Sequence, residues 1–166
     1  MYHMVQRIET TARSSADATT VYSLLTDGKT WPVWSPLESF TLEAEAPGGG
    51  EGLGAIRVFR TGRSVSREEI VELVPDRRFS YALLSGLPLR NYRANVDLTP
   101  VDGGTVIHWR SSFTAKVPGT GWIYRWALGR FIQRCVDGLA AHATAREPSR
   151  AEDVPRQPRR PASDNR

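Results

Sequence analysis

The sequence predicts an α+β domain in which a curved antiparallel sheet of about seven strands wraps around a long C-terminal helix. Three observations support this prediction. Strand-like segments recur at hairpin spacing between turn signals, the last long segment has helical periodicity, and 166 residues suffice to bury one core without disulfides or metals. Because no long helix separates the later strands, we expect the sheet to be antiparallel.

The first third of the chain predicts two strands separated by short helical segments. Residues 5–13 have the pattern of a strand. Residues 17–26 predict a short amphipathic helix, with Asp17 placed to cap its first turn. Residues 31–36, Trp-Pro-Val-Trp-Ser-Pro, contain too many prolines for a long helix, which leaves a short helical turn or an irregular loop. A second strand is expected at residues 37–46.

The middle of the chain predicts a meander of five further strands with a turn signal between neighbours: residues 55–61, 65–73, 78–84, 92–98 and 105–115. The clearest of these strands is 92–98, in which apolar and polar residues alternate strictly. A period of two indicates one buried and one solvated face.

The chain then predicts a helix over residues 120–145. A stripe of side chains recurs at steps of three and four along it: Tyr124, Leu128, Phe131, Ile132, Cys135, Leu139 and His142. Burying each large apolar member is worth about 1.5–3 kcal/mol, so we expect this stripe to face the sheet. Trp122 and Trp126 lie off the centre of the stripe, where they could cover the sheet edge, a partner or the mouth of a cavity.

Composition and charge exclude several classes of protein. The net charge of +4 is divided between residues 1–145, the expected domain, and residues 146–166, a Pro/Arg-rich tail expected to be disordered, so no basic stripe favours nucleic acid. The N-terminus has no apolar signal-peptide core, and no window approaches eighteen apolar residues. With a single cysteine as well, we expect a cytoplasmic protein without disulfides.

Several segments together resemble the START/Bet v 1-like (SRPBCC) superfamily, and more narrowly its bacterial polyketide cyclase/dehydrase-like branch. They are Val-Tyr-Ser-Leu-Leu-Thr-Asp at 21–27 leading into Trp31 and Trp34, Gly-Ala-Ile-Arg at 54–57, Glu-Leu-Val-Pro-Asp-Arg-Arg-Phe-Ser-Tyr at 72–81, Gly-Leu-Pro-Leu-Arg-Asn-Tyr at 86–92, and Gly-Gly-Thr at 103–105 with Trp109 beyond. The resemblance covers residues 5–145. It implies the helix-grip fold and a cavity between sheet and helix that holds lipids, polyketides or other apolar compounds. It implies no shared catalytic set.

Metal, nucleophile and phosphate chemistry have little support in the sequence. His3, His108 and His142 belong to separate segments, so we expect neither a metal site nor a cofactor. Cys135 lies within the apolar stripe, as a small buried side chain would. The glycines between 48 and 54 precede a strand and lack the Lys-Ser/Thr of a phosphate-binding loop.

One charged constellation is a candidate for chemistry. In a hairpin around Gly62, a two-residue turn places Arg57 opposite Glu68, and one more turn residue places it opposite Glu69. If Arg57 faces inward with Phe59, the pair could orient a carbonyl or hydroxyl, or act as an acid and base. The alternative is a solvated ion pair of little consequence.

Aromatic residues give the stronger indication of a site, although each alone is consistent with core packing. The predicted ligand-binding residues are Trp31, Trp34, Arg57, Phe59, Tyr81, Tyr92, Trp109, Phe113, Tyr124, Leu128 and Phe131. Together they predict an apolar pocket for a hydrophobic small molecule. Two alternatives remain: a cyclase/dehydrase- or isomerase-type enzyme using polar residues of the same pocket, and an interaction module working through Trp122, Trp126 and the tail.

Overall fold

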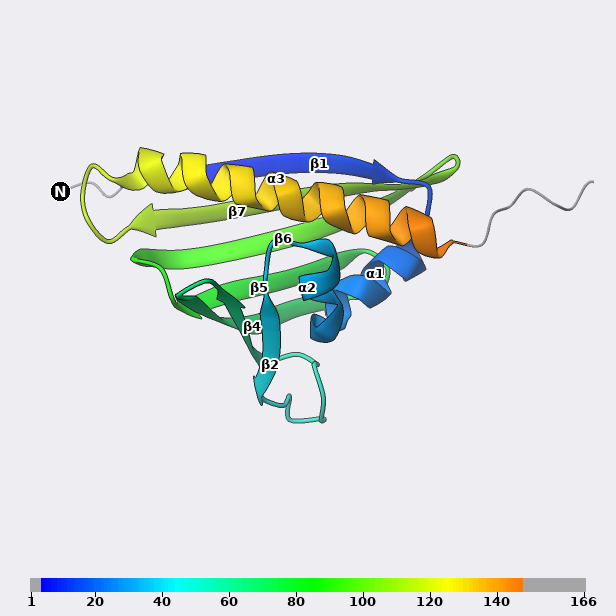
Figure 1. Ribbon diagram of the computed structural model, residues 1–166, viewed down its shortest axis with the longest axis horizontal. Helices are drawn as coiled ribbons and strands as arrows, with labels where there is room; N and C mark the ends of the chain where they lie inside the picture. The colour runs from blue at the N-terminus through cyan, green and yellow to red at the C-terminus, as the bar shows by residue number, and fades with distance from the viewer. Residues whose placement is uncertain (1–3, 148–166) are drawn as a thin grey trace, which may run out of the picture.

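Seven antiparallel strands form one sheet in the computed structural model, which describes residues 4–147 (Figure 1). The strands are β1 (Gln6–Ser14), β2 (Ser39–Ala44), β3 (Ile56–Thr61), β4 (Ser64–Val74), β5 (Arg78–Ser85), β6 (Leu89–Val101) and β7 (Gly104–Ala115). Their order across the sheet is β1-β7-β6-β5-β4-β3-β2, so β1 and β2 are the edges. The predicted α+β helix-grip architecture is confirmed, with all seven strands near their expected positions.

Four helical segments accompany the sheet: α1 (Ala18–Thr26), the 3-10 turn η1 (Gly28–Thr30), α2 (Trp31–Trp34) and α3 (Gly121–Arg146). The Asp17 carboxylate caps α1 by accepting a hydrogen bond of 2.8 Å from the Thr20 backbone N–H. The proline-broken segment is therefore a short helix, the first of the two predicted alternatives. This short helix carries Trp31 and Trp34, and both side chains are buried in the core.

The long helix α3 runs beside β1 and across the open face of the sheet (Figure 1). Its second half is fixed to the rest of the domain. Gly138 permits a close approach to α2, because a Cβ at that position would overlap the carbonyl oxygen of Trp34. Near the end of the helix, the Thr144 hydroxyl lies 2.9 Å from the Ser14 hydroxyl, and Glu147 accepts a hydrogen bond from Thr20. The buried residues of α3 are Ile132, Cys135, Val136, Leu139, Ala140 and Ala143.

The β3–β4 hairpin sets the register that places the charged pair. Its turn contains two residues, Gly62 and Arg63, with Thr61 opposite Ser64, and Gly62 adopts a φ of 58° that glycine tolerates well. Arg57 consequently lies opposite Glu68. Arg57 and Phe59 share the inner face and are almost completely buried.

Some predictions concern residues that the structure does not describe. The expected disordered tail, residues 146–166, lies outside the described residues apart from Arg146 and Glu147, and so does His3. Within residues 4–147, none of the helices is long and apolar enough to cross a bilayer.

Candidate functional site: a cavity between the sheet and α3

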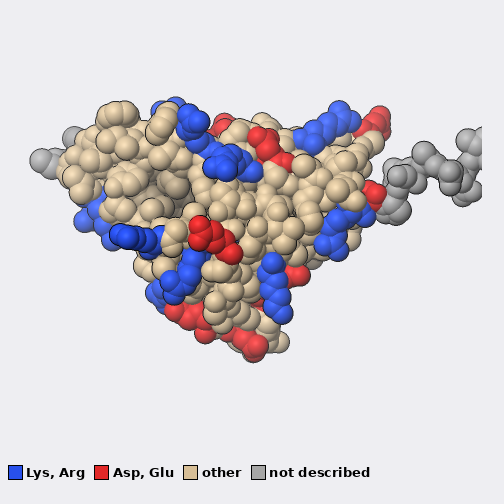
Figure 2. Space-filling model, viewed as in Figure 1, with Lys and Arg blue, Asp and Glu red and all other residues tan. Residues whose placement is uncertain are grey.

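A cavity of about 350 Å³ lies between the inner face of the sheet and the first half of α3. Figure 2 shows a hollow in the surface beside this half of the helix. The lining is mostly apolar and comes from seven elements and the loops beside them: Trp31, Leu37, Thr61, Ser64, Ser66, Glu68, Tyr81, Leu83, Leu87, Tyr92, Trp109, Tyr124, Ala127, Leu128, Phe131, Ile132 and Cys135. A volume of this size is within the range of small-molecule sites.

The structure brings together most of the side chains that the sequence nominated. Those that line the cavity are Trp31, Tyr81, Tyr92, Trp109, Tyr124, Leu128 and Phe131. Four others, Trp34, Arg57, Phe59 and Phe113, are buried in the core beside the cavity and do not belong to its lining. Whether any of these residues binds a ligand remains a prediction.

Trp31 is the centre of the aromatic cluster behind the cavity. Its ring centroid lies 4.7 Å from that of Trp34, 5.3 Å from that of Phe59 and 5.7 Å from that of Trp109. Its indole N–H donates a 3.0 Å hydrogen bond to the Leu25 carbonyl at the end of α1, which satisfies its one donor. The Trp31 indole is thus held in one orientation and forms a rigid part of the cavity wall.

Arg57 is completely buried behind this wall. Its guanidinium carbon lies 4.5 Å from the ring centroid of Trp31 and 4.9 Å from that of Phe79, and its Nη1 donates to the Leu25 carbonyl at 3.1 Å. Burial lowers the pKa of Arg57, and the nearby carboxylates of Glu68 and Glu51 oppose this effect. The side chain holds a positive charge next to the cavity without lining it.

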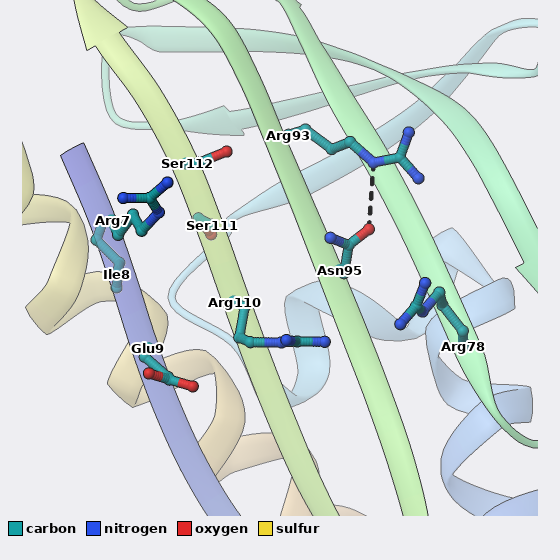
Figure 3. A pocket seen from close by; sticks show the side chains of 9 residues that line it. All are labelled: Arg7, Ile8, Glu9, Arg78, Arg93, Asn95, Arg110, Ser111 and Ser112. Atoms are coloured by element: carbon teal, nitrogen blue, oxygen red, sulfur yellow. Dashed lines mark hydrogen bonds between the residues drawn. The ribbon is translucent and has the colours of Figure 1, made fainter. Parts of the chain in front are cut away.

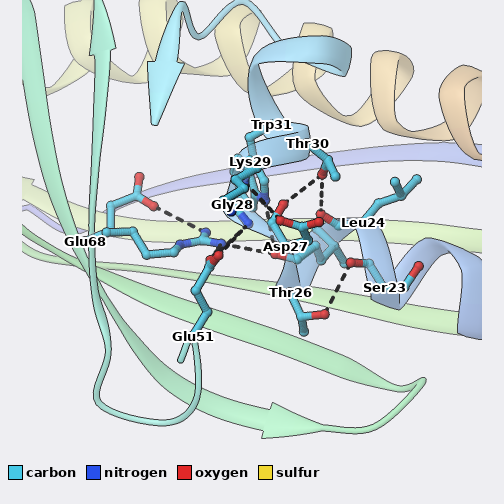
Figure 4. A network of polar contacts seen from close by, with 12 residues as sticks. Ser23, Leu24, Thr26, Asp27, Gly28, Lys29, Thr30, Trp31, Glu51 and Glu68 are labelled. Carbon is cyan, nitrogen blue, oxygen red and sulfur yellow. Dashed lines mark hydrogen bonds and ion pairs between the residues drawn. The ribbon is translucent and has the colours of Figure 1, made fainter. Parts of the chain in front are cut away.

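Two carboxylates approach this guanidinium, Glu51 at 3.5 Å and Glu68 at 3.8 Å (Figure 4). Glu51 comes from the loop before β3 and accepts hydrogen bonds from the Gly28 N–H at 2.9 and 3.1 Å. Burial raises the pKa of Glu51, and Arg57 opposes the shift. No local sequence signal indicates Glu51, because its position depends on where a glycine-rich loop folds against η1.

Glu68 is the charged residue that reaches the cavity. Burial raises the pKa of its carboxyl to about 7, against the opposing effect of Arg57. Its Oε2 atom has no hydrogen-bond partner among the described residues. Glu69, the alternative partner that the sequence left open, lies opposite Ile56 and does not line the cavity. Of the two predicted partners of Arg57, the structure therefore places Glu68, and not Glu69, opposite Arg57 and in the cavity lining.

A second polar atom of the cavity-lining side chains also has no hydrogen-bond partner among the described residues, the Nε1 of Trp109. The indole N–H can only donate a hydrogen bond. The Tyr92 hydroxyl, in contrast, lies 3.1 Å from the Ser111 hydroxyl. Burial raises the pKa of Tyr92 to about 12 and that of Tyr81 well above its ordinary value, so both phenols are neutral hydrogen-bonding groups near neutral pH.

Several lining residues were missed by sequence reasoning. Leu83 follows Tyr81 by two positions on β5, so strand alternation could have identified it. Ile132 and Cys135 were already part of the predicted helical stripe. Leu37 and Leu87 come from connecting segments, where no periodicity indicates which way a side chain points.

The described residues contain no cluster of three or more His, Cys, Asp or Glu side chains that could hold a metal ion. His108 lies on the outer face of β7, with its Nε2 2.7 Å from Glu9. Cys135 is buried, and burial raises the pKa of its thiol, so it is not a thiolate nucleophile near neutral pH.

A second hollow, on the outer face of the sheet, carries four arginines: Arg7, Arg78, Arg93 and Arg110 (Figure 3). Three of them are paired. Arg78 and Arg110 contact Asp97, and Arg93 contacts Glu72 at 2.6 Å. These arginines are solvated, and the carboxylates of Asp97 and Glu72 offset much of their charge. The outer hollow is therefore a weaker candidate than the inner cavity.

Comparison with known proteins agrees with this architecture. Residues 5–144 match the family model described as "Polyketide cyclase / dehydrase and lipid transport". The chain belongs to this family. No curated protein gives a significant match to the chain.

Several solved structures share the fold of this polyketide cyclase/dehydrase-family protein at low sequence identity. A START superfamily protein from Mycobacterium smegmatis is 14% identical, with a TM-score of 0.72 over 84% of this chain and 97% of the other. Norcoclaurine synthase from Thalictrum flavum, solved in complex with dopamine and hydroxybenzaldehyde, is 12% identical. Its TM-score is 0.68, and the match covers 87% of this chain and 90% of the synthase chain. The di-domain ARO/CYC StfQ from the steffimycin biosynthetic pathway is 18% identical. Its TM-score is 0.72, and the match covers 87% of this chain and 52% of the StfQ chain.

Proposed function

We propose that this protein binds an apolar small molecule in the cavity between the sheet and α3. The observation that carries the proposal is a volume of about 350 Å³ bounded mainly by aromatic and aliphatic side chains. An apolar ligand that fills this volume would remove the apolar surface of the lining from water.

Two polar atoms without a hydrogen-bond partner indicate which polar group the ligand should carry. Glu68 Oε2 and Trp109 Nε1 both belong to cavity-lining side chains and lack a hydrogen-bond partner among the described residues, and Glu68 Oε2 forms only the 3.8 Å ion pair with Arg57. Leaving a buried polar group unpaired costs about 1–3 kcal/mol. A hydroxyl or carbonyl oxygen placed against one of these side chains would relieve part of this cost, since it accepts from the indole N–H or from a protonated carboxyl. We therefore favour an apolar ring or chain compound that carries one such group.

Binding of the fluorescent probe N-phenyl-1-naphthylamine, together with mass spectrometry of molecules extracted from the purified protein, tests the proposal. Leu128→Trp should weaken probe binding at least tenfold, because the larger side chain occupies the cavity. Arg134→Trp adds an indole on the exposed side of α3 and should leave binding unchanged. Thermal unfolding of each variant verifies that it is folded. A folded Leu128→Trp protein that binds like the wild type would contradict the proposal.

An enzyme of cyclase, dehydrase or isomerase type is the second candidate, and Glu68 favours it. A carboxyl group with a pKa near 7 can both give and take a proton near neutral pH. Glu68 would be the acid or base, Tyr81 or Tyr92 would assist through their hydroxyls, and Arg57 would be a positioning residue behind it. Incubating the extracted ligand with wild type and Glu68→Gln separates the candidates. A product formed only by the wild type supports the enzyme, whereas an unchanged ligand with both proteins supports binding alone.

A further inference from the structure

The outer side of the first half of α3 exposes large apolar side chains to solvent. Trp122 is 68% exposed, Trp126 is 63% exposed and Ile123 is 45% exposed. All three lie within two turns of the helix. Large indole rings left in water on adjacent turns are unusual for a surface that contacts nothing else.

The charged residues beside these rings on α3 are basic. Arg125 and Arg130 flank them, and the Arg130 guanidinium carbon lies 5.3 Å from the ring centroid of Trp126. Residues 121–134 contain no aspartate or glutamate. Indole rings prefer the headgroup level of a bilayer, and arginines are attracted to anionic lipids. A protein partner could also accept tryptophan and arginine, but the absence of acidic residues from positions 121–134 favours a uniformly negative surface.

The same turns of α3 border the cavity on their other side. Tyr124, Leu128 and Phe131 line it from the helix, and Ala127 both lines the cavity and is exposed. The exposed apolar surface is therefore continuous with the entrance of the cavity, beside which the space-filling view is hollowed (Figure 2). An apolar compound that entered here from a lipid phase would avoid crossing water.

We propose that the first half of α3 docks on an anionic lipid surface through Trp122, Trp126, Arg125 and Arg130. The contact is interfacial, with the indole rings at headgroup depth and the arginines against the lipid phosphates. Docking does not require the cavity to be occupied, so it stands apart from the proposed ligand binding.

Co-sedimentation of the full chain with vesicles tests the docking. Vesicles of phosphatidylcholine mixed with phosphatidylglycerol should bind the wild-type protein, and phosphatidylcholine alone should bind it much more weakly. The double variant Arg125→Gln/Arg130→Gln should lower the partition coefficient about 30-fold, and added salt should weaken wild-type binding. Trp122→Ser/Trp126→Ser should lower it at least tenfold.

Matched controls are available elsewhere on the surface. Val33→Ser on α2 removes another highly exposed apolar side chain, and Arg77→Gln removes an exposed arginine in the β4–β5 turn. Both should bind like the wild type, and every variant keeps the C-terminal residues unchanged. Equal binding by the tryptophan variant, or no binding to either kind of vesicle, would overturn the proposal. Self-association that is lost in the tryptophan variant, without lipid binding, would instead assign the surface to a second copy of the chain.

Discussion

The two faces of the sheet use the same kinds of charged side chain in opposite ways. On the outer face, Asp97 contacts two arginines, Arg78 and Arg110, in a solvated network. On the inner face, the single guanidinium of Arg57 is shared by Glu51 and Glu68 at 3.5 and 3.8 Å. The Asp97 carboxylate is therefore paired with two cations, whereas the carboxylates of Glu51 and Glu68 have one cation between them.

This difference shifts the pKa values of the two faces in opposite directions. Burial alone would raise the pKa of Asp97, but hydrogen bonds from Arg78 and Arg110 outweigh it, and the pKa is lowered. Burial dominates at Glu68 and raises its pKa to about 7. A carboxyl group that is both buried and under-neutralised is a candidate for a reactive or ligand-binding group, whereas solvated pairs such as those on the outer face contribute little to stability.

Removing the cation on each face should produce the largest contrast. Arg57→Met leaves Glu51 and Glu68 without their shared charge and should destabilise the fold by about 3–5 kcal/mol. Arg110→Met, its matched control on the outer face, should cost about 1 kcal/mol or less because its partner keeps Arg78. Urea denaturation of both variants measures the difference. Equal losses would mean that the buried cation is no more important than a surface one.

Glu68→Gln should remove a pH dependence of stability. The raised folded-state pKa means that the native protein holds a proton between the ordinary pKa of 4.5 and about 7, while the unfolded chain has lost it. Wild-type stability should therefore fall, relative to the variant, as pH rises through this window, by up to roughly 3 kcal/mol. Denaturation at several pH values checks the sign. A wild-type protein that gains stability relative to Glu68→Gln over this window would show that Glu68 is ionised by its neighbours.

The sequence could predict the fold and, within the buried charged cluster, the pairing of Arg57 with Glu68 or Glu69. Strand alternation, turn residues and the helical stripe are local signals, and they identified the seven strands and α3. The hairpin turn also limited the partner of Arg57 to Glu68 or Glu69, and the two-residue turn at Gly62 and Arg63 decides for Glu68.

The remainder of the site depends on contacts between distant segments. Glu51 lies 23 positions from Gly28, and only the packing of the glycine-rich loop against η1 brings them together. Phe59 and Phe113 have the same inward alternation as Tyr81, so periodicity could not distinguish core packing from cavity lining. That distinction depends on where α3 leaves the sheet uncovered.

Asp97→Asn should have the smallest effect and the opposite dependence on pH. Since the folded pKa of Asp97 is lowered, its contribution to stability is present above the ordinary value of 3.8 and is lost as the pH falls through the lower folded value. Near neutral pH the variant should lose about 1 kcal/mol or less, and added salt should reduce that loss because the pairs are solvated. Urea denaturation with and without salt measures this, with Glu68→Gln as the buried counterpart that salt should affect less. A larger loss at Asp97 than at Arg57 would reverse the ranking of the two faces and place the stabilising electrostatics on the outside of the sheet.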